Sequence, residues 1–111
     1  MMNRVQLRTD AVMEKIMVTV DADLADLIPG FLENRARDLR QLSEGLSRGD
    51  FETIRIIGHS MKGSGGGYGF DALTELGAAI EAAAKNADTA AVANLIGELD
   101  AYLQRVEVTY A

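Results

Sequence analysis

Apolar residues recur every three or four positions through four long segments of this chain, and only a few residues separate one segment from the next. Such spacing places the apolar side chains on one face of an α-helix, and that face has to be buried against other helices. Amphipathic helices joined by short loops pack as antiparallel neighbours. The sequence therefore predicts an all-α fold, an antiparallel four-helix bundle.

Residues with known preferences for helix ends indicate where the helices begin and end. Proline suits the first turn of a helix, aspartate its N-cap and glycine its C-cap. The residues that mark the expected boundaries are, in chain order, Pro29, Gly49, Asp50, Asp71, Asn86, Asp88 and Arg105. A short helix over residues 22–28 is expected before the first long one, unless residues 22–47 form a single helix with a kink at Pro29.

Two short segments, near the beginning and at the end of the chain, have a different pattern. Apolar side chains alternate with others in residues 16–20, which is typical of a short extended piece, and residues 106–110 look similar. Pairing of the two as a small ribbon is one arrangement that the pattern allows, although isolated two-stranded pairs are only marginally stable. Residues 1–12 are polar and weakly patterned, so we expect a flexible extension followed by one domain over residues 13–111.

Composition narrows the classes of partner and location. The net charge of −6 argues against nucleic acid or an anionic membrane as the main partner. The chain has no cysteine for disulfides or metal sites, its first residues lack the pattern of a signal peptide, and no apolar stretch reaches the roughly 20 residues that span a bilayer. We expect a cytoplasmic protein without a metal site, and a monomer because no apolar stripe is left over once the bundle is filled.

The only histidine, His59, lies in the helix that Asp50 caps, at the start of a glycine-rich run. Residues three and four positions apart share a helix face, so Lys62 and Gly63 lie beside it. At ~100° per residue, the centre of the apolar stripe of this helix lies about 160° from His59. The stripe consists of Ile54, Ile57, Met61, Ser64 and Tyr68. The imidazole is therefore expected to point into water.

The neighbours of His59 on this face suit a phosphoryl acceptor. A neutral imidazole is a nucleophile, and a phosphoryl group attached to it brings close to two negative charges. Lys62 and Arg55 would stabilise that charge, as cations do in phosphoryl transfer. Glycine is unfavourable inside a helix, so Gly63 and Gly66 indicate that open space beside His59 has a use.

The chain around His59 resembles the histidine-containing phosphotransfer domain, which relays phosphoryl groups in multi-step two-component signalling. The residues that carry the likeness are the run His59-Ser60-Met61-Lys62-Gly63-Ser64, Gly69-Phe70, Leu73, Leu76, Gly77, Ile80 and Glu81, together with Asp50-Phe51-Glu52 and the run from Pro29 to Arg35. The likeness extends over roughly residues 16 to 105. It implies a four-helix bundle with an exposed phospho-accepting histidine.

By position, the resemblance also implies roles for three residues. His59 would be the phosphoacceptor, Lys62 would stabilise the charge, and Gly63 would be the small residue that lets a partner's active site approach. The protein would then be a phosphoryl carrier and not an independent catalyst.

The partners that the resemblance implies are response-regulator receiver domains and hybrid histidine kinases. The donor would be an aspartyl phosphate on a receiver, and His59 would attack its phosphorus in line. No cofactor is expected on this chain, because Mg²⁺ would belong to the receiver. Docking would use the exposed helix face, with Arg55, Ile56 and Gly66.

Two other classes of function remain open from the sequence. One is a helical interaction or adaptor module without phosphotransfer, in which His59 is incidental. The other is an enzyme with residues 63–67 as a nucleotide-binding loop, but such loops follow a strand and precede their lysine, whereas Lys62 comes before these glycines.

Overall fold

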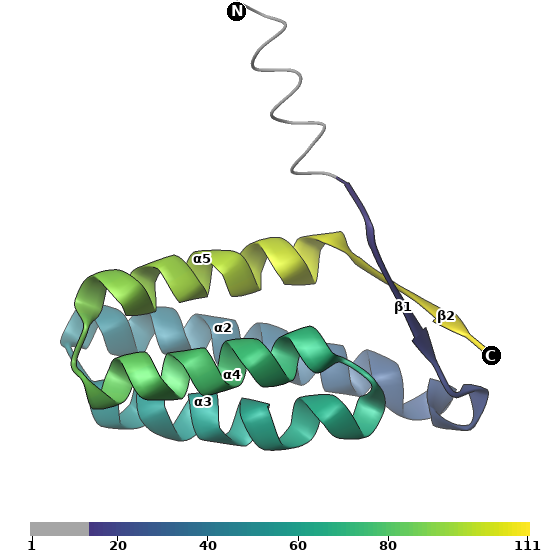
Figure 1. Cartoon of the computed structure of the whole chain (residues 1–111), viewed down its shortest axis with the longest axis horizontal. Coiled ribbons are helices and arrows are strands. Elements are labelled where there is room, and N and C mark those ends of the chain that lie inside the picture. The colour runs from purple at the N-terminus through teal and green to yellow at the C-terminus, as the bar shows by residue number, and fades with distance from the viewer. Residues whose placement is uncertain (1–13) are drawn as a thin grey trace, which may run out of the picture.

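Four long α-helices make up most of the part of the chain that the computed structural model describes, residues 14–111. The elements follow in the order β1 (Ile16–Val20), η1 (Ala22–Leu27), α2 (Ile28–Arg48), α3 (Phe51–Gly65), η2 (Gly66–Tyr68), α4 (Asp71–Lys85), α5 (Thr89–Arg105) and β2 (Val106–Tyr110). Consecutive helices pack antiparallel and α5 returns to α2, with the two strands beyond one end (Figure 1). The predicted four-helix bundle is confirmed, and the predicted extension over residues 1–12 lies outside the described residues.

The helix ends lie where the capping residues indicate. Gly49 adopts the left-handed conformation, with a φ of 68°, and ends α2. Asp50 accepts a hydrogen bond from the backbone N–H of Thr53 at 3.1 Å and begins α3. Asp88 does the same for α5 through the N–H of Ala91, also at 3.1 Å. These three boundaries confirm that local side-chain chemistry sets the lengths of the helices.

The segment before α2 differs from the α-helix predicted over residues 22–28. Ala22–Leu27 forms a 3-10 helix without a buried residue, and α2 begins directly after it with Pro29 in its first turn. Leu24 and Leu27 are three residues apart, which matches the repeat of a 3-10 helix, and Leu27 remains 52% exposed. Because none of its residues is buried, packing does not impose α-helical geometry on this segment.

The core lies along the axis of the bundle and takes large side chains from all four α-helices. The largest fully buried ones are Ile28, Leu42, Ile54, Met61, Phe70, Leu73, Ile80, Val92 and Leu99. Each contributes about 1.5–3 kcal/mol on burial. Near one end, the ring of Phe31 packs between Tyr68 and Phe70, with centroid distances of 4.7 and 5.1 Å.

Helices α3 and α4 touch through their backbones. A Cβ atom on Gly77 would lie 2.5 Å from the backbone nitrogen of Lys62 and 2.7 Å from the carbonyl oxygen of Gly58. A Cβ on Gly58 would lie 2.7 Å from the backbone nitrogen of Glu81. Both distances are too short for a real side chain. The two glycines therefore set how closely α4 approaches the helix that carries His59.

Strands β1 and β2 pair in parallel, in register from Ile16 opposite Val106 to Val20 opposite Tyr110. The hydroxyl groups of Thr19 and Thr109 lie 3.1 Å apart on the exposed face of this ribbon. Val20 is buried on the other face. The ribbon thus joins the beginning and the end of the described chain beside the bundle.

Candidate functional site

His59 projects from α3 into water, on the side opposite the core. Its side chain is 65% exposed, whereas Ile54, Ile57 and Met61 on the other face of the helix are buried. This orientation follows from the helical periodicity of the apolar residues. The imidazole is therefore accessible to a partner molecule.

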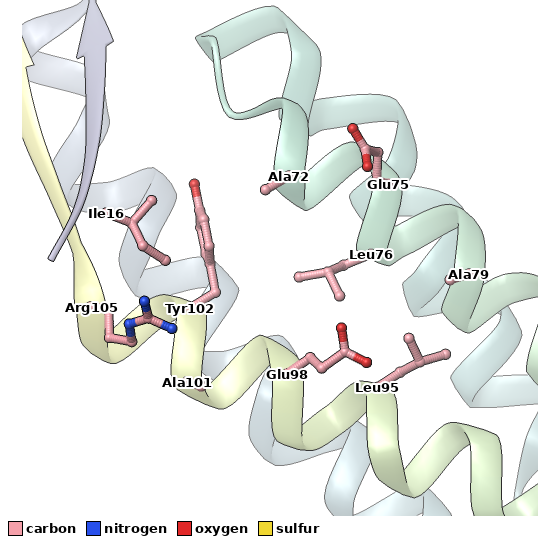
Figure 2. A pocket seen from close by; sticks show the side chains of 10 residues that line it. All are labelled: Ile16, Ala72, Glu75, Leu76, Ala79, Leu95, Glu98, Ala101, Tyr102 and Arg105. Carbon is pink, nitrogen blue, oxygen red and sulfur yellow. The ribbon is translucent and has the colours of Figure 1, made fainter. Parts of the chain in front are cut away.

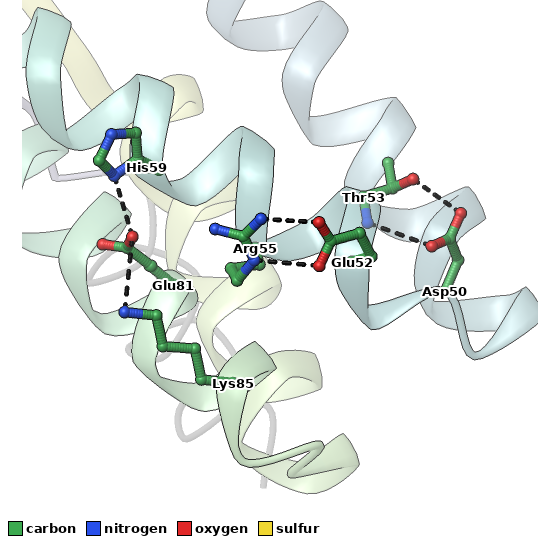
Figure 3. A network of polar contacts seen from close by, with 7 residues as sticks. All are labelled: Asp50, Glu52, Thr53, Arg55, His59, Glu81 and Lys85. Carbon is green, nitrogen blue, oxygen red and sulfur yellow. Dashed lines mark hydrogen bonds and ion pairs between the residues drawn. The ribbon is translucent and has the colours of Figure 1, made fainter.

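One ring nitrogen of His59 is occupied by an acid from the neighbouring helix. Nδ1 lies 2.9 Å from Oε2 of Glu81, which projects from α4 (Figure 3). The Glu81 side chain is only 9% exposed. An ionised carboxylate can only accept hydrogen bonds, so Nδ1 donates to it, and in the neutral ring Nε2 then carries the free electron pair.

Two lysines surround the same carboxylate. Nζ of Lys62, on α3, lies 3.1 Å from Oε1 of Glu81, and Nζ of Lys85, on α4, lies 3.9 Å from Oε2. The Lys62 ammonium holds the pKa of Glu81 below its usual value, against the opposing effect of desolvation, and His59 and Lys85 lower it further. Glu81 is therefore ionised at neutral pH although it is buried.

Arg55, expected to flank the imidazole, is engaged elsewhere. Its guanidinium donates two hydrogen bonds to Glu52, at 2.7 and 3.1 Å, along the surface of α3 (Figure 3). The spacing of Glu52 and Arg55 by three residues could have predicted this pair. Of the two cations predicted beside His59, Lys62 forms an ion pair with the partner of the ring and Arg55 does not.

The remaining predicted residues leave the surface open. A Cβ atom on Gly63 would meet nothing within 4 Å, and one on Gly66 would lie 3.6 Å from the hydroxyl oxygen of Thr74. Ile56, one turn before His59, is 52% exposed. The face around the imidazole thus has an exposed apolar side chain, Ile56, on one side of the ring and no side chain at Gly63 on the other.

Comparison with known proteins identifies the family. The model of the Hpt domain matches residues 26–109, about three quarters of the chain. The chain belongs to the Hpt domain family. Hpt domains are phosphocarriers that take part in histidine-containing phosphotransfer in phosphorelays, where they interact with receiver domains and kinases. A search of curated proteins and a search of solved structures found no significant match.

A buried arginine holds the far end of α3 in this Hpt domain. Arg35 on α2 donates a hydrogen bond to the hydroxyl of Ser64 at 2.8 Å, lies 2.8 Å from the Asp38 carboxylate, and stacks 4.9 Å from the ring centre of Phe31. Burial raises the pKa of Asp38, although Arg35 opposes this. Helical periodicity predicts Ser64 on the apolar stripe, but no spacing along the chain points to its partner on another helix.

The glycine-rich segment of this Hpt domain does not have the form of a nucleotide-binding loop. Residues 63–65 complete α3, and Gly66–Tyr68 continue as the 3-10 helix η2. A phosphate-binding loop of the Walker type follows a strand, and the element before this segment is a helix. Residues 63–67 are therefore not a Walker-type loop.

One groove of the Hpt domain lies away from the helix that carries His59. This groove between α4, α5 and β1, lined by residues such as Leu76, Leu95 and Tyr102, takes none of its lining from α3 (Figure 2).

Within residues 14–111, no three His, Asp or Glu side chains lie close enough together to hold a metal ion. In the same part of the chain, no helix has both the length and the apolarity needed to cross a bilayer.

Proposed function

We propose that this Hpt domain carries a phosphoryl group on Nε2 of His59, which it accepts from the aspartyl phosphate of a receiver domain, or from a kinase, and passes to another receiver domain. The observation that supports this most directly is the state of the ring. Nδ1 is bound to Glu81 at 2.9 Å, while the side chain is 65% exposed. Nε2 is thereby left as a nucleophile on the surface.

In the loading step, the electron pair of Nε2 attacks the phosphorus of the aspartyl phosphate in line. The P–N bond forms as the P–O bond breaks, and that electron pair returns to the carboxylate of the receiver. Lys62, with its ammonium 3.1 Å from Glu81 and its side chain 43% exposed, is close enough to turn toward the incoming phosphoryl oxygens. Mg²⁺ and most of the transition-state stabilisation belong to the receiver, so this chain needs no cofactor of its own.

Docking of the receiver would use the open face around His59. Gly63 adds no side chain there, which lets the active site of the receiver come within bonding distance of the ring. Ile56 supplies exposed apolar surface, while Arg55 and Gly66 lie at the edges of the face. Such relay contacts are small and short-lived, which suits a carrier that has to leave one partner before it meets the next.

Location and assembly follow from the same proposal. The relay would operate in the cytoplasm, where the ATP from which kinases take phosphoryl groups is found. A monomer suffices, because one accessible ring carries one phosphoryl group and the face around it has to stay free for successive partners.

The test is transfer from a phosphorylated receiver domain to the purified protein. We expect radioactive phosphate that is stable in base and labile in acid, as a phosphorus–nitrogen bond is, and its complete loss in His59→Gln. Ser60→Ala is the matched control, because Ser60 is exposed beside His59 and a serine phosphate is stable in acid. If His59→Gln accepts label as well as the wild-type protein does, the carrier proposal is wrong and an adaptor module becomes the better description.

A further inference from the structure

Glu81 is a buried acid that touches the reacting ring but not the reacting nitrogen. Its carboxylate lies 2.9 Å from Nδ1 of His59 and 3.1 Å from Nζ of Lys62, with 9% of the side chain exposed. Burial of a charge is costly unless the charge is paired, so this acid needs its cations in order to stay ionised. A neutral side chain of similar shape would avoid that cost. The charge of Glu81 therefore calls for an explanation beyond packing.

The chemistry of onward transfer supplies one. When a phosphoryl group leaves Nε2, the electron pair of the P–N bond returns to that nitrogen. If Nδ1 carries a proton, the leaving group is a neutral imidazole. If Nδ1 is bare, the leaving group is an imidazolate anion, which is far more basic and departs far more slowly. The protonation of Nδ1 in the phosphorylated state thus decides how good a donor the carrier is.

We propose that the Glu81 carboxylate keeps the proton on Nδ1 of phosphorylated His59, so that the ring leaves as neutral imidazole in onward transfer. This rests on the proposed function of His59. In the step, the Nε2–P bond breaks with its electron pair going to Nε2, the new P–O bond forms to the aspartate of the acceptor receiver, and the Nδ1 proton stays in place. Glu81 is therefore a positioning residue that acts through the imidazole.

A charged carboxylate does this better than an amide would. An ionised carboxylate only accepts, so it has a favourable contact with Nδ1 solely when that nitrogen carries hydrogen. An amide can turn and donate to a bare Nδ1 just as well. Lys62 and Lys85 on either side keep Glu81 ionised, since Lys85 lies 3.9 Å from the same oxygen that bonds the ring.

The backbone contact between the helices keeps the carboxylate in reach. Gly58 precedes His59 and packs against the backbone nitrogen of Glu81 itself, since a Cβ on Gly58 would lie 2.7 Å from it. The two side chains that share the proton therefore start from adjoining backbone positions. The close packing of α3 on α4 therefore keeps the backbone of Glu81 beside His59.

The test compares wild type with Glu81→Gln, which keeps the shape of the side chain and removes its charge. Both are loaded with phosphoramidate, a small donor that phosphorylates histidine without a receiver. Decay of the P–N signal is then followed by ³¹P NMR in buffer and after addition of a receiver domain. An opposite charge at this distance changes a proton equilibrium by about tenfold or more, so we expect both decays to slow by about tenfold in Glu81→Gln.

Glu52→Gln is the matched control, because it removes one acid from the same surface of α3 that pairs with Arg55 and not with the ring. In buffer, without a receiver, its P–N signal should decay at the wild-type rate. Equal rates for wild type and Glu81→Gln would overturn this inference and leave the proposed function intact. Failure of the wild-type protein to take up phosphate on His59 would remove both.

A measurement on the wild-type protein alone covers the case in which Glu81→Gln does not fold. The ¹⁵N chemical shift of Nδ1 in the phosphorylated ring distinguishes a protonated nitrogen from a bare one. We expect the protonated form at neutral pH. A bare Nδ1 in the phosphorylated wild-type protein would overturn the inference without any variant.

Discussion

At the scale of single residues, the ring of His59 lies between water and a buried acid. Solvent reaches Nε2, while Nδ1 bonds to Glu81, and Lys62 bonds to the other oxygen of that carboxylate. Charge-assisted contacts of this kind fix both the tautomer and the rotation of the ring. The orientation of the ring is thus set by contacts within the protein itself.

Replacement of Lys62 by alanine should slow phosphoryl transfer to His59 on the order of tenfold, because the cation nearest the incoming charge is lost. The fold should persist, since the Lys62 side chain is 43% exposed. Rapid-quench measurement of loading and a thermal unfolding curve test the two statements. Lys15→Ala is the control: that lysine pairs with Glu107 on the ribbon, and its removal should leave loading unchanged. A collapse of stability in Lys62→Ala would mean that the residue is structural.

At the scale of the elements, α3 and α4 form one unit. The carbonyl of Gly58 and the backbone of Gly77 meet without side chains between them, which brings His59 and Glu81 together from different helices. By contrast, Gly63 is on the open side of α3. Glycine thus occurs in two opposite settings in this pair of helices, at a tight contact between backbones and on an open surface.

Alanine substitutions at Gly63 and Gly77 distinguish the open position from the tight contact. Gly63→Ala should stabilise the protein by about 0.5–1 kcal/mol, because alanine favours helix and meets no atom there. Gly77→Ala gains the same propensity, but its Cβ would lie 2.5 Å from the backbone of Lys62, so we expect a net loss of about 1–3 kcal/mol. Urea unfolding measures both free energies. Equal stability of the two variants would contradict the tight contact.

The difference between features within one helix and contacts between helices also explains how much of the fold and of the site the sequence could predict. The boundaries at Gly49, Asp50 and Asp88 depend on residues next to each other in the chain, and the outward direction of His59 depends on periodicity within one helix. Such local features could be predicted. The bond from His59 to Glu81 depends on how α3 slides along α4, which periodicity within one helix does not specify.

Two other features of the structure could not be predicted, because they too depend on more than the spacing of residues within one helix. The bond from Arg35 to Ser64 joins α2 to α3, and no spacing along the chain points to it. The 3-10 form of Ala22–Leu27, a segment without a buried residue, is not specified by its spacing of apolar residues. The pairing of Arg55 with Glu52 is different, since it lies within one helix and could have been found.

At the scale of the whole molecule, the ionised acids link stability to pH. Hydrogen bonds from Thr53 lower the pKa of Asp50, and Lys62 lowers that of Glu81. A lowered pKa in the folded state stabilises the fold above the unfolded pKa, and this contribution is lost as the pH falls through the folded value. The reference values are 3.8 for aspartate and 4.5 for glutamate, so the loss should begin near pH 4.5.

Thermal unfolding followed from about pH 6 to about pH 3 should therefore show a falling midpoint, and Glu81→Gln should show a shallower fall. Asp38 works in the opposite direction, because burial raises its pKa and protonation then favours the folded state. Asp38→Asn should accordingly show a steeper fall than wild type. A midpoint that stays constant through this range would contradict the linkage.

The parallel ribbon has a mechanical consequence. The chain enters β1 at Ile16 and leaves β2 at Tyr110, so tension between these two residues pulls the paired strands along their length in opposite directions. In that geometry the force acts on all the hydrogen bonds between the strands at once, so they have to break together. In an antiparallel hairpin pulled from its ends, they would break one after another. The helices, which lie between the two strands in the chain, therefore carry none of this tension while the strands stay paired.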